Sequence, residues 1–198
     1  MYIRTQIGIE GYMNKIHILE HFISADECRK LVSYFDKVSF PGPDPLVKFV
    51  SLANETVLFD MKPDNEFPIF SVDIHNLLNR IRDEVSNTYN LDLEIKSSNY
   101  VNMTKGSSLG MHVDMEASND PLDDNDTLHA SEFEFAALLY LNDEYEGGHL
   151  HFPEQEFKES PKPGTLVFFN GNSDMPHEVT EVLAGNRKNI ASFYRRKK

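Results

Sequence analysis

A histidine and an aspartate two residues apart, with a second histidine far downstream, have the residue types of a metal site. His112 and Asp114 flank a single valine, and His177 follows later in the chain. On a β-strand, alternate residues point to one face, so a strand here would place an imidazole beside a carboxylate. Two histidines and one carboxylate leave three coordination positions open, which is typical of non-haem Fe(II).

Arg187 could place a positive charge beside this metal. It lies near the start of the last expected strand, and alternation predicts that Arg187 points inward and Lys188 points outward. A buried guanidinium binds a carboxylate well in bidentate geometry, and it needs such an anion because an unpaired buried charge is costly. The sequence therefore predicts an anion site next to the metal.

Other histidines and acidic residues offer alternatives. His149 and His151 form an H-x-H pair that could begin a metal site of the cupin type. Residues 115–132 are strongly acidic, and they could form a solvated loop or a wall for a basic substrate. Residues 39–68 are expected to be irregular because of their prolines and glycine, and could form a surface loop or a lid over the substrate.

The remaining pattern predicts one domain over residues 1–198, mainly β with flanking helices. Ser24 and Glu27 have the spacing of a capping box that starts a helix reaching about Lys37. A one-sided apolar stripe predicts a second helix over 70–89, which Asn90 ends. Strands are expected at 15–22, 94–103, 133–141 and 165–170. A further strand, the last of the chain, is expected to start near Arg187.

Composition limits the possible partners. The chain has 198 residues and a formal net charge of −13, which argues against a nucleic-acid substrate. Cys28 is the only cysteine, so no intramolecular disulfide can form, as is typical of a reducing compartment. Neither a signal peptide nor a membrane-spanning run is recognisable, and a cytoplasmic location is expected.

Four segments resemble, in order and spacing, the double-stranded β-helix (jelly roll) of the 2-oxoglutarate- and Fe(II)-dependent oxygenases, and are most similar to its prolyl 4-hydroxylase-like branch. They read EFAALLYLN from Glu134, GGHLHFPE from Gly147, KPGTLVFFN from Lys162 and HEVTEV from His177. The resemblance covers about residues 15–195. It implies that the two N-terminal helices back the major sheet.

The resemblance also implies roles for individual residues. His112, Asp114 and His177 would bind Fe(II), and 2-oxoglutarate would chelate the iron through its 1-carboxylate and keto oxygen. The distal carboxylate of 2-oxoglutarate would pair with Arg187, with Lys188 as the alternative because related enzymes often use lysine. Tyr100 and Tyr140 match positions that contact the co-substrate in relatives. Leu109 stands where many relatives have a tyrosine, which would alter the substrate pocket.

The activity implied is hydroxylation of an unactivated C–H bond, with consumption of O2 and release of succinate and CO2. The carboxylate of Asp114 favours hydroxylation over halogenation, and ascorbate is a candidate supporting factor. A peptidyl proline is the substrate that the resemblance favours. A free amino acid or another small molecule is the alternative, followed by a zinc hydrolase or cupin chemistry and by a non-catalytic binding role.

Overall fold

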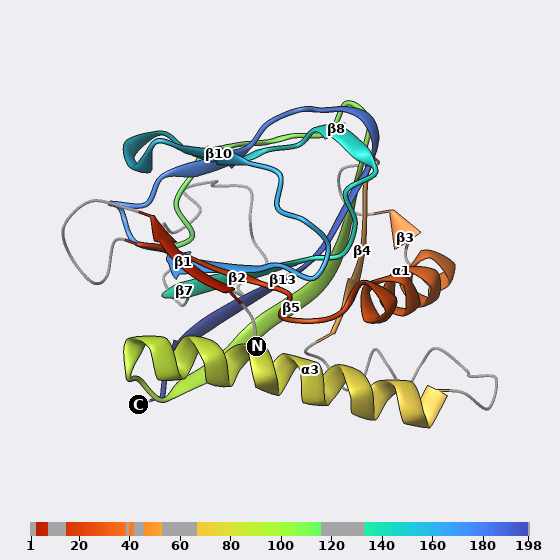
Figure 1. Cartoon of the computed structure of the whole chain (residues 1–198), viewed down its shortest axis with the longest axis horizontal. Coiled ribbons are helices and arrows are strands. Elements are labelled where there is room, and N and C mark those ends of the chain that lie inside the picture. Colours follow the sequence, from red (N-terminus) through yellow and green to blue (C-terminus); the bar gives the residue numbers. More distant parts are fainter. Residues whose placement is uncertain are drawn as a thin grey trace, which may run out of the picture.

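The computed structural model describes residues 3–7, 15–38, 40–41, 46–52, 67–115 and 133–197. Within this part of the chain, a larger and a smaller antiparallel sheet face each other, and two helices lie on the far side of the larger sheet (Figure 1). This is the expected jelly roll, with α1 (Ala25–Val38) and α3 (Phe67–Tyr89) backing the major sheet.

The strand order places residues from distant parts of the sequence side by side. The major sheet runs β1 (Ile3–Ile7), β2 (Ile16–Glu20), β11 (Leu166–Asn170), β7 (Phe135–Tyr140), β13 (Val182–Arg196), β5 (Leu93–Thr104), β4 (Val47–Ser51) and β3 (Phe40–Pro41), and β8 (Tyr145–Gly147) pairs with β13. The minor sheet runs β10 (Phe157–Glu159), β9 (Leu150–Phe152), β12 (His177–Val179) and β6 (Leu109–His112), and a 3-10 turn, η2 (Pro153–Gln155), joins β9 to β10.

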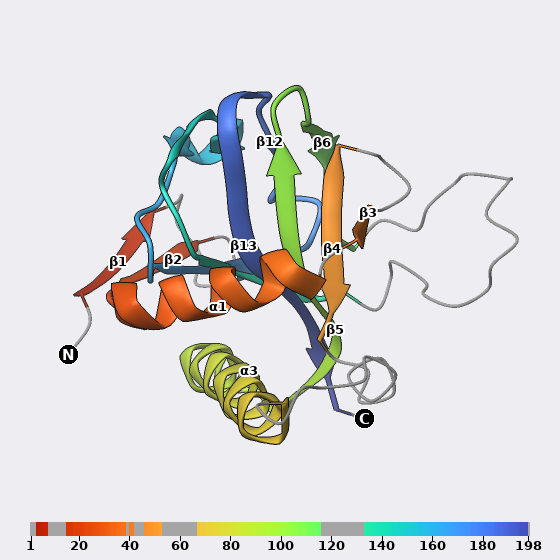
Figure 2. The ribbon, with the colours of Figure 1, turned by 90° about the vertical axis from the view of Figure 1, so that its right-hand side faces the viewer.

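The first helix starts at the predicted capping box. The backbone N–H of Glu27 donates to Ser24 Oγ at 3.2 Å, and the backbone N–H of Ser24 donates to Glu27 Oε2 at 2.8 Å. These reciprocal bonds satisfy donors that the first helical turn leaves without partners. From this cap, α1 crosses the major sheet and buries Leu31 and Phe35 against it (Figure 2).

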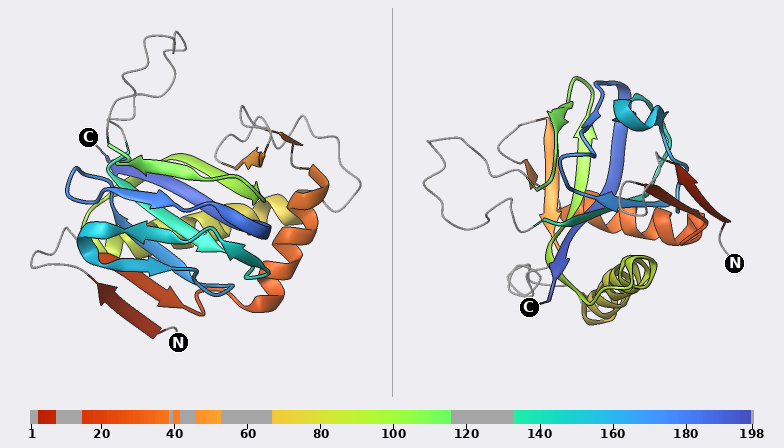
Figure 3. Two further views of the ribbon diagram at one scale, coloured as in Figure 1. Left: turned by 90° about the horizontal axis from the view of Figure 1, so that it is seen from above. Right: turned by 90° about the vertical axis from the view of Figure 1, so that its left-hand side faces the viewer.

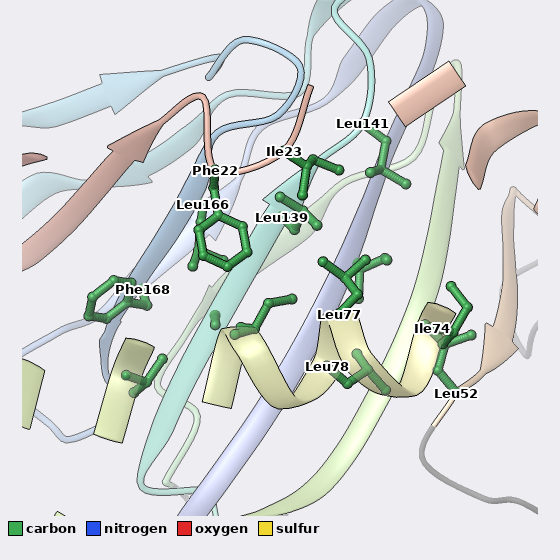
Figure 4. Packing of buried hydrophobic residues seen from close by; sticks show 14 of the residues in the cluster. Phe22, Ile23, Leu52, Ile74, Leu77, Leu78, Leu139, Leu141, Leu166 and Phe168 are labelled. Carbon is green, nitrogen blue, oxygen red and sulfur yellow. The ribbon is translucent and has the colours of Figure 1, made fainter. Parts of the chain in front are cut away.

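The second helix packs through the apolar stripe visible in its sequence. Ile74, Leu77 and Leu78 point from α3 toward the major sheet, where they join Leu139 and Leu166 in one core (Figure 4). Seen from above, α3 lies beneath the strands (Figure 3). At Asn90 the backbone turns left-handed, with φ at 53°, and the helix ends as expected.

The long central strands separate this core from a cavity. Ile190 and Tyr194 of β13 face the helices, whereas Arg187, Asn189 and Ala191 line a cavity between the two sheets. This alternation is the one predicted for the last strand. One strand therefore serves the core with one face and the cavity with the other.

Several boundaries differ from the sequence expectation. Residues 47–51 are not irregular but form β4, because they pair with β5 from Val47↔Met103 to Ser51↔Asn99. The last strand starts at Val182, before Arg187, because its first residues pair with β8. Asp114 lies in a turn after β6 and not on the strand itself. Residues 40–41 of the predicted irregular segment also form a strand, β3, and residues 67–68 belong to α3, which starts three residues before the expected position. Residues 39, 42–45 and 53–66 of that segment, and residues 116–132 of the acidic segment, lie outside the described residues.

Neither helix in the described ranges has the length and apolar character needed to cross a membrane.

We predict that Ser24→Ala lowers the free energy of unfolding by about 1 kcal/mol, because it removes the hydroxyl that caps α1. Urea denaturation followed by circular dichroism measures the change. Ser33→Ala, at an exposed position within the same helix, is the matched control and should cost nothing. Equal loss in both variants would contradict a role for the cap.

Candidate active site

His112 and His177 lie opposite each other on the face of the minor sheet that lines the cavity. They are register partners between β6 and β12, and their ring centroids are 4.3 Å apart. The Nδ1 atom of His112 lies 2.8 Å from the carbonyl of Gly110, and Nδ1 of His177 lies 3.1 Å from the carbonyl of Met175. Because a carbonyl only accepts, each Nδ1 carries the proton and each Nε2 keeps a lone pair for a metal.

Asp114 completes the group from the turn after β6. Its carboxylate oxygens lie 3.7 Å from His112 Nε2 and 3.8 Å from His177 Nε2, too far for hydrogen bonds. Its Oδ2 atom is buried and has no hydrogen-bond partner in the described part of the chain. Burial raises the pKa of Asp114 to about 6, although His112 opposes the shift. A buried carboxylate oxygen without a partner fits a metal ligand.

Gly171 gives this turn the room that it needs. A Cβ atom at Gly171 would lie 2.8 Å from the Cβ of Asp114 and 2.8 Å from the carbonyl of Phe133. The backbone N–H of Met115 also donates to the carbonyl of Gly171 at 2.9 Å. Gly171 therefore positions Asp114, a role that shows only in the packing and not in the sequence.

His177 is held in the neutral form that binds metals. Its ring stacks on Phe152 at 4.9 Å and meets the edge of Phe169 at 4.8 Å. Burial, with a smaller contribution from His112, lowers the pKa of His177 to about 4, although the hydrogen bond to the Met175 carbonyl opposes the shift. A neutral imidazole with a free Nε2 is ready to coordinate a metal at neutral pH.

The three side chains fit a single metal ion. One ligand atom from each of His112, Asp114 and His177 lies within 4.8 Å of the others, and no second group of this kind occurs among the described residues. The other H-x-H pair is used differently: His149 Nδ1 lies 2.9 Å from Ser160 Oγ, and His151 Nδ1 lies 2.8 Å from Glu178 Oε1. The predicted residues are therefore together, and the alternative pair is apart from them.

Arg187 is buried in the same cavity with only neutral partners. Its Nη1 donates to Asn189 Oδ1 at 2.7 Å, and its Nη2 donates to the Tyr140 hydroxyl at 2.7 Å. Its side chain is 2% exposed, its Nε has no partner, and no described carboxylate lies within 4.0 Å. The charge is therefore not neutralised by the described residues, and a carboxylate ligand would supply the missing anion.

The cavity that joins the metal ligands to Arg187 is mostly apolar. It has a volume of about 190 Å³ and contains His112, Asp114 and His177 as well as Arg187. Its apolar lining includes Leu138, Leu150, Phe169, Val179 and Ala191. Leu109, which stands where the family resemblance leads one to expect a tyrosine, lines the cavity and is 49% exposed. Such a lining strengthens electrostatic interactions inside and keeps water out.

The packing of Arg187 explains why position 148, the second of two adjacent glycines, has no side chain. Its φ is 59°, and a Cβ atom there would lie 3.1 Å from Arg187 Cδ and 3.1 Å from Val182 Cγ2. The stem of Arg187 therefore packs directly on the glycine backbone. A side chain at this position would be strained and would push Arg187 away.

The two predicted tyrosines lie in different places. Tyr140 contacts Arg187, and burial raises its pKa although Arg187 opposes the shift, so the phenol keeps a proton that it can donate. The prediction for Tyr100 is wrong. Its side chain faces the helices, stacks on Phe35 and donates to Asp36 Oδ1 at 2.8 Å, because Tyr100 points to the face of β5 opposite its neighbours Asn99 and Val101, which line the cavity.

Lys188 does not face the cavity. Its Nζ lies 2.6 Å from Asp36 Oδ2, on the side of the sheet that α1 covers. Arg187 is thus the cation that the strand presents to the cavity. The sequence argument did not assign a role to Asn189, although alternation placed it on the same face as Arg187.

Comparisons with known proteins agree with this arrangement. The family model of the 2OG-Fe(II) oxygenase superfamily matches residues 96–195. The chain is 23% identical to prolyl 3-hydroxylase 1 of Gallus gallus over 205 residues, which cover 89% of this chain and 28% of the relative. The chain thus spans less than a third of the length of the curated relatives that it matches.

Two solved structures share the fold. Viral collagen prolyl hydroxylase vCPH from Paramecium Bursaria Chlorella virus-1, in complex with 2OG, has a TM-score of 0.66 at 17% identity, covering 96% of this chain and 98% of the other. A Pseudomonas putida prolyl-4-hydroxylase has a TM-score of 0.65 at 19% identity, covering 92% and 93%.

A jelly roll that carries two histidines and a carboxylate on one face defines the class of mononuclear non-haem metal enzymes. Within this class, the chain belongs to the 2OG-Fe(II) oxygenase superfamily, because the family model matches half of its length. The family implies Fe(II) and 2-oxoglutarate as its cofactor and co-substrate.

We predict that Asp114→Asn stabilises the metal-free protein at pH 8 by up to about 3 kcal/mol. The folded-state pKa of Asp114 is raised from 3.8 to about 6, so the folded protein binds this proton more tightly than the unfolded chain. Stability therefore falls as pH rises through this window, and asparagine removes the loss. Urea denaturation in the presence of a chelator, at pH 5 and pH 8, measures the difference.

The same variant should lose the stabilisation that Mn(II) gives to the wild-type protein, because a neutral amide is a weaker ligand than a carboxylate. A variant that is less stable than wild type at pH 8 would contradict the buried, unpaired carboxylate. Retained stabilisation by Mn(II) would contradict its role as a ligand.

Proposed function

We propose that this protein is an Fe(II)- and 2-oxoglutarate-dependent hydroxylase that acts on a peptidyl proline. The observation that carries the proposal is the buried Arg187, which has no anionic partner in the described chain and lines the same cavity as the metal ligands. A metal site alone fits many chemistries. A cation at this place fits a co-substrate that binds the metal at one end and carries a carboxylate at the other.

Each group in the cavity then has a role. His112, Asp114 and His177 hold the iron, and bound iron with 2-oxoglutarate and O2 supplies the oxidising power for the C–H bond while succinate and CO2 are released. Arg187 binds the distal carboxylate of 2-oxoglutarate, and the Tyr140 hydroxyl donates its proton to the same group. The apolar lining excludes water from the reacting atoms.

The relatives support proline as the substrate, since they are named prolyl hydroxylases. Hydroxylation of a free amino acid or another small molecule is the second possibility. A zinc hydrolase would use the same three ligands but would leave Arg187 without a purpose. A cytoplasmic location and support of activity by ascorbate complete the proposal.

We predict that Arg187→Ala raises the apparent KM for 2-oxoglutarate about 100-fold, because two charge-assisted hydrogen bonds are lost. The requirement for iron should change much less. Succinate formation at varied 2-oxoglutarate and Fe(II) measures both. Lys188→Ala, at the adjacent residue whose ammonium group pairs with Asp36, is the matched control and should change the KM less than twofold. An unchanged KM in Arg187→Ala would place the anchor elsewhere.

Succinate formation also tests the substrate. Protein loaded with Fe(II) without oxygen is given 2-oxoglutarate, and O2 is then admitted with proline-rich peptides, with free amino acids or with neither. Succinate that rises only with the peptides, together with a mass increase of one oxygen atom on proline, is the expected result. A rise with free amino acids alone would indicate that a free amino acid, and not a peptidyl proline, is the substrate. Iron-loaded protein that forms no succinate would refute the proposed hydroxylase activity.

A further inference from the structure

The edge of β13 beside Arg187 lacks a strand partner. On one side, β5 continues past this point and pairs Met103 with Arg187. On the other side, β7 ends at Tyr140, whose partner is Asn189. On that side, the carbonyl of Asn186 and the backbone N–H of Lys188 therefore have no partner in the backbone of β7. Buried backbone groups without partners are costly, so something must replace the strand.

The side chain of Asn142 replaces it. Asn142 Oδ1 accepts from the backbone N–H of Lys188 at 2.8 Å, and Asn142 Nδ2 donates to the carbonyl of Asn186 at 2.8 Å. The backbone N–H of Leu141 adds a third bond to the carbonyl of Lys188 at 3.0 Å. The Asn142 amide thus binds the peptide groups on both sides of Arg187.

Asparagine is well suited to this place. Its amide presents one acceptor and two donors on a short side chain, which copies the donor and acceptor of a peptide group. Aspartate could accept from Lys188 but could not donate to Asn186, and leucine could do neither. Asn142 is 8% exposed, so water has little access to replace the lost bonds.

We propose that Asn142 is a positioning residue that fixes the place of Arg187 and thereby sets the affinity for the distal carboxylate of a dicarboxylate co-substrate. The proposal rests on the proposed function. Asn142 is not among the residues that line the cavity, so it acts through Arg187. A shift of β13 against residues 140–142 would also lengthen the contact from Arg187 Nη2 to the Tyr140 hydroxyl, now 2.7 Å.

The test compares two ligands that share the metal-chelating end. 2-Oxoglutarate and 2-oxobutyrate both carry a 1-carboxylate and a keto oxygen, but only 2-oxoglutarate has a distal carboxylate. Calorimetric titration into Mn(II)-loaded protein measures the binding of each. Asn142→Leu should weaken the binding of 2-oxoglutarate about 3- to 10-fold and leave the affinity for 2-oxobutyrate unchanged.

A double-mutant cycle adds a readout that a merely structural role would not give. In an Arg187→Ala background, Asn142→Leu should cause no further loss of 2-oxoglutarate affinity, because the group it positions is gone. Ser98→Ala is the matched control. It removes the buried bond between Ser98 Oγ and Ser192 Oγ, 2.7 Å long, which joins β13 to β5 and not to the residues that follow β7. It should lower the melting temperature without changing the affinity for either ligand.

Equal weakening of both ligands, no change with 2-oxoglutarate, or additive losses in the double variant would each overturn the proposal. If Asn142→Leu does not fold, Asn142→Asp keeps the acceptor for Lys188 and should show a smaller loss that is again selective for 2-oxoglutarate. A wild-type protein that binds Mn(II) but not 2-oxoglutarate would instead refute the proposed function. The two failures are thus distinguishable.

Discussion

Two buried charged groups of opposite sign constrain the rest of this structure, because no described salt bridge between a carboxylate and a lysine or arginine neutralises either of them. Asp114 and Arg187 line one apolar cavity, yet no described salt bridge joins them. In a medium that screens poorly, each group destabilises the folded protein unless a ligand compensates its charge. The cavity therefore keeps an unfavourable electrostatic state that a metal and an anion would relieve. Binding and stability are linked at this site through the same atoms.

The fold tolerates this cost because its stabilising contacts are made elsewhere. The helices cover one face of the major sheet with a large apolar core, and the cavity lies on the other face. A long strand such as β13 takes part in both, since alternate residues face opposite sides. The position of Arg187 is thus supported by the packing of Ile190 and Tyr194, which do not line the cavity.

Much of this arrangement could be predicted from sequence, because period-two and helical patterns are local. The capping box at Ser24, the end of α3 at Asn90 and the inward face of β13 follow directly from residue type and spacing. The side chain of Tyr100 could not be placed in this way. Its strand directs side chains to both faces of the sheet, and which face lies against the helices depends on where α1 packs. Asp114 reaches the histidines from a turn, since Gly171 leaves room for it, and only the folded chain reveals that contact.

The adjacent cations of β13 have a consequence for how the sheet assembles. Arg187 faces the cavity, and Lys188 on the other face of the strand pairs with Asp36 of α1. If β13 paired with its neighbours one residue out of register, a positive charge would therefore still point to each side of the sheet. Charge alone thus distinguishes the two registers poorly. Shape and hydrogen bonding must make the choice: the slipped strand would bury Asn189 among the helices and turn Ile190 into the cavity. Register fidelity in this chain depends on its uncharged residues.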